Sequence, residues 1–114
     1  MRFLPTTTLA LLVLVVTASD GVAKEVTKIE DIERGASVTL QGEVTRIVDE
    51  DEFRLQDDTG SVRVYVGWRN RVTVAVGETI TVRGFVDDDL IDFFRPEIYA
   101  REVVRADGTA ITFD

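Results

Sequence analysis

Residues 52–66 constrain the fold of this chain most strongly, because they read as two alternating apolar–polar runs joined by a short polar turn. The turn is Asp57-Asp58-Thr59-Gly60, a four-residue hairpin connection. If Gln56 pairs with Ser61, the apolar residues of both runs share one face and the charged residues share the other. The further predicted pairs are Leu55 with Val62, Phe53 with Val64, Arg54 with Arg63, and Glu52 with Tyr65. The hairpin therefore has one core-facing side and one polar side.

Three more alternating runs predict strands over residues 37–47, 79–86 and 97–105, and residues 111–113 are expected to add a short terminal strand. Gly42 and Gly84 each occupy the inward phase of their run. A glycine there allows the sharp bend that closes a short sheet into a barrel. We therefore expect an all-β chain, a small five-stranded OB-fold (Greek-key) barrel, with an SH3-like barrel as the nearest alternative.

A short N-terminal helix is expected before the first strand. Thr27 and Glu30 have the spacing of a capping box, and Gly35 suits the position after a helix C-terminus. A helix of about two turns would lay Ile29 and Ile32 over the end of the sheet.

Residues 1–23 have the features of a cleaved signal peptide. Arg2 precedes an uninterrupted apolar run over residues 9–16, and small residues lead up to Ala23; cleavage after Ala18 is an alternative. The apolar run is short for a membrane anchor. The sequence thus predicts an exported, periplasmic domain over residues 24–114 that has no disulfides.

The amino-acid composition excludes several kinds of catalytic and metal site. The chain has neither histidine nor cysteine, which removes Ser-His-Asp and Cys-His catalysis and ordinary zinc sites. We expect no enzymatic activity and no cofactor. Loss of residues 1–23 would take away one basic and one acidic residue, so the net charge of −8 is unchanged. That charge opposes nucleic acid as a partner.

Arg54 and Arg63 oppose each other on the polar side of the hairpin, an unfavourable pairing unless something offsets it. The offset is either an anionic ligand beside Tyr65 or a neighbouring carboxylate, Glu43 or Glu52. The candidate ligand-binding residues on this face and its flanking loops are Arg54, Gln56, Arg63, Tyr65, Trp68, Asp87, Asp88 and Asp89.

Two acidic loops, residues 49–52 and 87–92, flank the usual binding face of an OB barrel. They are either plain solvated turns or a surface that favours a cation or a basic peptide. Neither has the spacing of a calcium loop, so no dedicated metal site is expected. The carboxylates that would form a rim for a loosely bound cation are those of Asp49, Asp51, Asp88 and Asp89.

Trp68, Phe93 and Phe94 form either an exposed aromatic platform or a plug for the open end of the barrel, and we favour the plug.

The order of these features resembles the bacterial OB-fold (BOF) family, the YgiW/YdeI-like group of periplasmic stress-tolerance proteins. The matching pieces are Leu40-Gln41-Gly42-Glu43-Val44, Phe53-Arg54-Leu55-Gln56-Asp57, Thr59-Gly60, Trp68, Val76-Gly77-Glu78-Thr79, Val82-Arg83-Gly84 and Glu97-Ile98. Phe85 and the apolar residues 90–96 depart from the family pattern. The resemblance implies a single-domain, exported, non-enzymatic protein that helps the cell envelope to tolerate stress.

Together these features favour a binding or protective module that takes a small or cationic ligand or a protein partner, with no membrane span in the mature chain. The alternative is an assembly protein that docks on an envelope partner through a strand edge or through a patch of Phe85, Phe93 and Phe94.

Overall fold

A computed structural model describes residues 25–88 and 96–114. The predicted signal peptide and Asp89, Phe93 and Phe94 lie outside these residues. The described part of the chain forms a 3-10 helix and six strands: η3 (Ile29–Asp31), β1 (Ser37–Asp49), β2 (Glu52–Gln56), β3 (Ser61–Tyr65), β4 (Thr79–Val86), β5 (Glu97–Val104) and β6 (Ala110–Thr112). No helix among the described residues is long and apolar enough to cross a membrane.

The β2–β3 hairpin has the predicted register, with Gln56 opposite Ser61 and Glu52 opposite Tyr65. Asp57 closes its turn, because its carboxylate accepts hydrogen bonds from the backbone N–H groups of Thr59 (2.8 Å) and Gly60 (3.1 Å). The side chains of Phe53 and Leu55 are buried, so the apolar face of the hairpin is a wall of the core.

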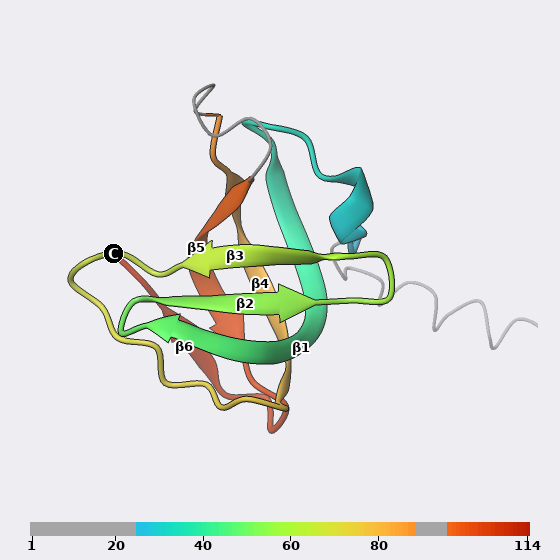
Figure 1. Cartoon of the computed structure of the whole chain (residues 1–114). Coiled ribbons are helices and arrows are strands. Elements are labelled where there is room, and N and C mark those ends of the chain that lie inside the picture. The colour runs from blue at the N-terminus through green and yellow to red at the C-terminus, as the bar shows by residue number, and fades with distance from the viewer. Residues whose placement is uncertain (1–24, 89–95) are drawn as a thin grey trace, which may run out of the picture.

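The strands close into a barrel with OB-fold connectivity (Figure 1). Strand β1 pairs with β2 through its C-terminal half and with β4 through its N-terminal half. Strand β5 pairs with β4, and the barrel closes where β3 and β5 run parallel, with Tyr65 opposite Tyr99. The short terminal strand β6 extends the sheet beside β5. The predicted five-stranded barrel is confirmed, with β6 as the expected addition.

The core lies inside this barrel and is built almost entirely from the inward phases of the strands. Its fully buried larger side chains are Phe53, Leu40, Leu55, Ile80, Ile98, Val44, Val62, Val64, Val82, Val86 and Val103. Gly42 and Gly84 stand where strands cross closely: a Cβ would meet the backbone carbonyl of Gln56 at Gly42 and that of Tyr99 at Gly84. Neither position has room for a side chain, which is a physical reason for a glycine on the inward phase of each strand.

The N-terminal helix lies where it was predicted, but it is shorter and of another kind. It is a single 3-10 turn with Lys28 at the N-cap position, and no side-chain hydrogen bond caps it. The prediction of a two-turn helix with a capping box at Thr27 is therefore wrong. Tertiary contacts hold this turn instead, since Ile29 donates its N–H to the Asp57 carboxylate (2.9 Å). Ile29 is buried and joins the core cluster. The 3-10 turn that carries it lies beside the β2–β3 turn (Figure 1).

Candidate functional site: an aromatic groove at the barrel closure

Three aromatic side chains from three strands form a row on the outer face of the barrel. Tyr65 of β3 and Tyr99 of β5 are register partners, and their ring centroids are 5.6 Å apart. Phe85 of β4 is opposite Tyr99 on its other side, with an edge-to-face contact at 5.2 Å. All three sit on the outward phase of their strands and are only partly buried. The strand pairing therefore places a row of aromatic rings on a solvent-facing surface, where it contributes nothing to the core.

This row lines a groove of about 280 Å³. Val66 and Gly67 border it after β3, Ala100 and Arg101 border it along β5, and Asp114 lies at its edge. A small concave site lined by aromatic rings with a few polar groups is typical of a ligand-binding site. We call this site the aromatic groove.

A β-bulge in β5 shapes one end of the aromatic groove. The register passes from Arg83–Glu102 to Gly84–Ala100, so Arg101 is an extra residue on its strand. Bulges re-aim side chains, and here the guanidinium of Arg101 lies over the Phe85 ring at 5.6 Å from its centroid. The Phe85 ring already serves as a partner for a cation.

The opposed arginines of the hairpin are satisfied within the protein. Arg63 forms an ion pair with Glu52 at 3.2 Å, as one of the two alternatives predicted. Within residues 25–88 and 96–114, no donor forms a hydrogen bond with Glu52 Oε2, so the contact with Arg63 is electrostatic. Arg54 donates from Nη2 to the hydroxyl of Ser61 (3.0 Å). These contacts favour the neighbouring carboxylate over an anionic ligand as the offset to the Arg54–Arg63 pairing.

The structure brings together only some of the predicted ligand-binding residues. Tyr65 lines the aromatic groove, and Arg63 precedes it on the same face by two positions. Gln56 is exposed at the end of β2 beside the hairpin turn. Asp89 lies outside the described residues.

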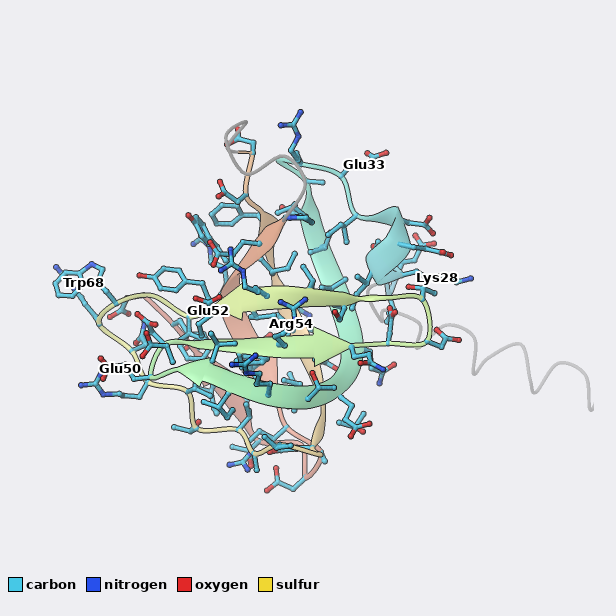
Figure 2. The ribbon with its side chains drawn as sticks, viewed as in Figure 1. Lys28, Glu33, Glu50, Glu52, Arg54 and Trp68 are labelled. Carbon is cyan, nitrogen blue, oxygen red and sulfur yellow. The ribbon has the colours of Figure 1, made fainter. Side chains whose placement is uncertain are left out.

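Trp68 does not plug the barrel, and that prediction is wrong. Its side chain is 72% exposed and projects from the loop after β3 away from the barrel (Figure 2). Arg69 lies over its ring, 5.0 Å from the centroid. Ile29 and Val74 are buried in the core cluster instead.

The described residues of the two acidic loops have different neighbours. Asp51 and Glu50 accept backbone hydrogen bonds from Val66 (2.9 Å) and Val72 (2.8 Å), and Glu50 pairs with Arg71. Asp88 instead lies close to Gly35, which precedes β1. Among residues 25–88 and 96–114, no three carboxylates gather as metal ligands would. The described part of the chain thus gives no support to a shared cation rim of Asp49, Asp51 and Asp88.

Sequence reasoning missed Tyr99 as a site residue and placed Phe85 only in a docking patch. Each residue occupies an outward position in an alternating strand. That alternation was the sequence signal that could have indicated a surface role. Their proximity to Tyr65 depends on the parallel β3–β5 pairing, which no local pattern reveals.

Comparisons with known proteins agree with this architecture. The family model described as Bacterial OB fold (BOF) protein matches residues 16–98. The solved structure of the hypothetical protein ygiW from E. coli is similar with a TM-score of 0.59 and 22% sequence identity, over 74% of this chain and 92% of that chain. At that identity the likeness shows the fold alone. A comparison with curated proteins finds no match. The chain belongs to the bacterial OB-fold (BOF) family.

Proposed function

We propose that this protein is an exported, non-enzymatic OB-fold module that contributes to envelope stress tolerance by binding a small organic cation in the aromatic groove. The observation that carries the proposal is the row of Tyr65, Tyr99 and Phe85 along a groove on the outer face. Aromatic rings gathered on a solvent-facing surface offer faces of negative potential to a ligand.

The overall charge of the chain favours a cation over an anion of the same shape, although the guanidinium of Arg101 also borders the groove. Asp114 lies at its edge, and the whole chain carries a net charge of −8. A cation above an aromatic ring gains about 0.5–2 kcal/mol, the larger value where the site excludes water. Arg101 shows this contact within the protein itself, on the Phe85 ring. An external cation would make the same kind of contact with the aromatic rings that line the groove.

Export is supported by the sequence features of residues 1–23, and a binding rather than catalytic role by the lack of histidine and cysteine. An envelope-stress role rests on the resemblance to BOF proteins. The module would act by association with its ligand, since the groove holds aromatic rings and no nucleophile–base pair.

The test is a melting-temperature series with choline, spermidine and a lysine-rich peptide, each at fixed ionic strength. Choline is compared with its neutral isostere, in which a tert-butyl group replaces the trimethylammonium group. Tyr65→Leu and Tyr99→Leu each remove one ring face and keep apolar volume. We expect a saturable stabilisation by a cation that both variants weaken.

Trp68→Leu is the matched control, because it removes an exposed aromatic ring outside the groove. It should leave the stabilisation unchanged. Equal stabilisation by choline and its isostere, or equal loss in the Trp68 and tyrosine variants, would refute a cation site in the groove.

Docking on a protein partner is the second candidate function, and the exposure of Trp68 favours it. Tryptophan and arginine are enriched among residues that dominate protein interfaces, and Trp68 stands with Arg69 against its ring. A protein that assembles with copies of itself through Trp68 would show a mass that rises with protein concentration, and Trp68→Leu would abolish that rise. A ligand-binding module keeps one mass and loses ligand binding only in the tyrosine variants.

A further inference from the structure

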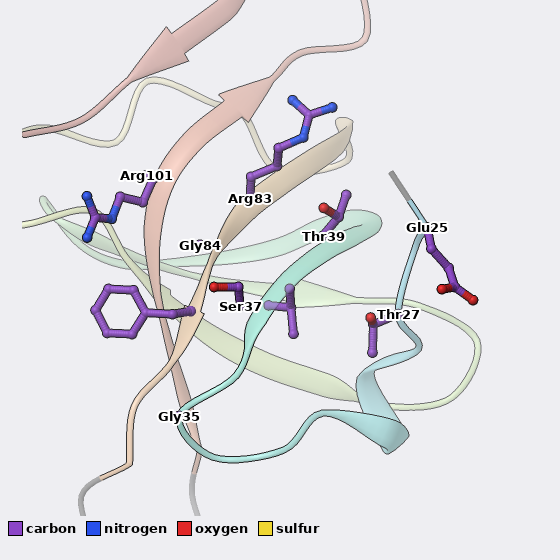
Figure 3. A pocket seen from close by; sticks show the side chains of 10 residues that line it. Glu25, Thr27, Gly35, Ser37, Thr39, Arg83, Gly84 and Arg101 are labelled. Carbon is purple, nitrogen blue, oxygen red and sulfur yellow. The ribbon is translucent and has the colours of Figure 1, made fainter. Parts of the chain in front are cut away.

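A second and larger groove, of about 850 Å³, lies on the outer face of β1 and β4 beside the N-terminal segment (Figure 3). Ser37 and Thr39 of β1 line it together with Phe85 of β4. Thr27 stands on one side and Arg101 on the other. We call this site the hydroxyl groove.

Backbone hydrogen bonds at two points hold the N-terminal segment beside the hydroxyl groove. Thr27 donates its N–H to the carbonyl of Thr39 (2.8 Å), and Gly35 donates to the carbonyl of Val86 (2.8 Å). These anchors fix the segment at both ends of the groove, so the hollow between the segment and β4 is part of the fold.

The lining of the hydroxyl groove is rich in hydrogen-bond donors. Thr27, Ser37 and Thr39 contribute hydroxyl groups, and Arg83 and Arg101 contribute guanidinium groups. The one carboxylate of the lining is that of Glu25, which is exposed. In a chain with a net charge of −8, the groove thus gathers two guanidinium groups and three hydroxyl groups, although Arg83 is paired with Glu102.

Arg83 and Arg101 differ in the partners that the protein provides for their guanidinium groups. Arg83 forms an ion pair with Glu102 through Nη1, while its Nε is buried and finds no acceptor among the described residues. Arg101 is the exposed bulge residue of β5, and its recorded partner is the Phe85 ring rather than a carboxylate. Among the described residues Arg101 is therefore a guanidinium available to an oxyanion.

We propose that the hydroxyl groove binds a small apolar carboxylate. The carboxylate accepts hydrogen bonds from Arg101 and from the hydroxyls of Ser37 and Thr39, and the apolar portion packs on Phe85. Guanidinium groups recognise carboxylates through paired N–H donors in a fixed plane. The hydroxyl groove shares Phe85 and Arg101 with the aromatic groove, but Tyr65 and Tyr99 do not line it. Tyr65→Leu and Tyr99→Leu therefore distinguish the cation site proposed above from this carboxylate site.

The test is a titration of the protein with benzoate, in which the backbone amide chemical shifts are measured. The protein is purified in the form that accumulates in the cell. Ionic strength is held constant, and benzyl alcohol and benzylamine are the neutral and cationic probes. We expect benzoate to shift the amides of Ser37 and Thr39 saturably, whereas neither comparison probe does so. Arg101→Gln should weaken benzoate binding about tenfold or more, because a hydrogen-bonded charge is lost.

Arg69→Gln is the matched control, since Arg69 is also an exposed arginine that stacks on an aromatic ring, in a distant loop. It should leave the benzoate affinity unchanged. Ser37→Asp is a second variant, at an exposed position. The carboxylate that it introduces should repel benzoate and abolish binding, while the amide spectrum should remain that of a folded protein. Absence of saturable shifts at these amides, or equal weakening by Arg69→Gln and Arg101→Gln, would overturn the proposal.

Discussion

The backbone carbonyl of Tyr99 occupies the space that a side chain at Gly84 would need. A Cβ at Gly84 would lie 2.9 Å from the carbonyl carbon of Tyr99 and closer still to its oxygen. Real Cβ contacts are not this short, so β4 and β5 approach to this spacing only where one of them carries a glycine. The same crossing positions Phe85 against Tyr99, and the aromatic groove therefore depends on Gly84.

Gly84→Val should lower the free energy of unfolding by about 1–3 kcal/mol, because the clash involves backbone that cannot rotate away. Urea denaturation followed by circular dichroism measures this change. Gly60→Ala is the control: the nearest atom to a Cβ there is a methyl carbon of Ile29 at 3.5 Å, an ordinary contact. An unchanged midpoint for Gly84→Val would argue against the close β4–β5 crossing.

Acid should weaken the link between the N-terminal turn and the hairpin. Burial tends to raise the pKa of Asp57, but hydrogen bonds from the Thr59 side chain and from the backbone of Ile29, Thr59 and Gly60 outweigh it and hold the pKa below its ordinary value. A depressed carboxyl pKa contributes stability that is present above about pH 4 and is lost as the pH falls through the folded-state value.

Asp57→Asn should therefore destabilise the protein at neutral pH, and the difference from the native chain should shrink as the pH falls toward 3. Urea midpoints over a pH series measure it. Asp58→Asn, an exposed position in the same turn, should have little effect at any pH. A destabilisation by Asp57→Asn that stays constant from neutral to acid pH would mean that the charge of Asp57 does not matter.

Much of the fold could be predicted because patterns within short stretches of the sequence determine it. Alternation in residues 52–66 gave the hairpin register, and the inward phase of Gly42 and Gly84 marked the strand crossings. The aromatic row could not be predicted, because Tyr65 and Tyr99 meet only through the parallel closure of the barrel. Trp68 was misplaced for a related reason: apolar character shows that a residue can be buried, but the topology decides which residue closes the barrel.

Oligonucleotides should not bind measurably at physiological salt. The net charge of −8 repels a polyanion, and binding to nucleic acid rests largely on phosphate contacts by basic side chains. Fluorescence anisotropy with labelled single-stranded and double-stranded DNA is the measurement. Micromolar affinity that falls steeply with salt would contradict the expectation.

Calcium should not stabilise the protein saturably at fixed ionic strength, whereas added sodium chloride should raise the melting temperature modestly. The described carboxylates of the two acidic loops form no cluster of metal ligands, so their effect is mutual repulsion that salt screens. Melting curves of the native chain and of Asp88→Asn combined with Asp89→Asn test this. A saturable gain with calcium that disappears in the double variant would establish a cation site at this loop.

The most direct test of the binding account is a map of amide chemical shifts during titration with choline and, separately, with its neutral tert-butyl isostere. The account predicts saturable shifts for choline at Tyr65, Val66, Tyr99 and Ala100, which border the aromatic groove, and much smaller shifts for the isostere. Choline shifts that do not saturate, or that concentrate in the acidic loop of residues 49–52, would contradict it.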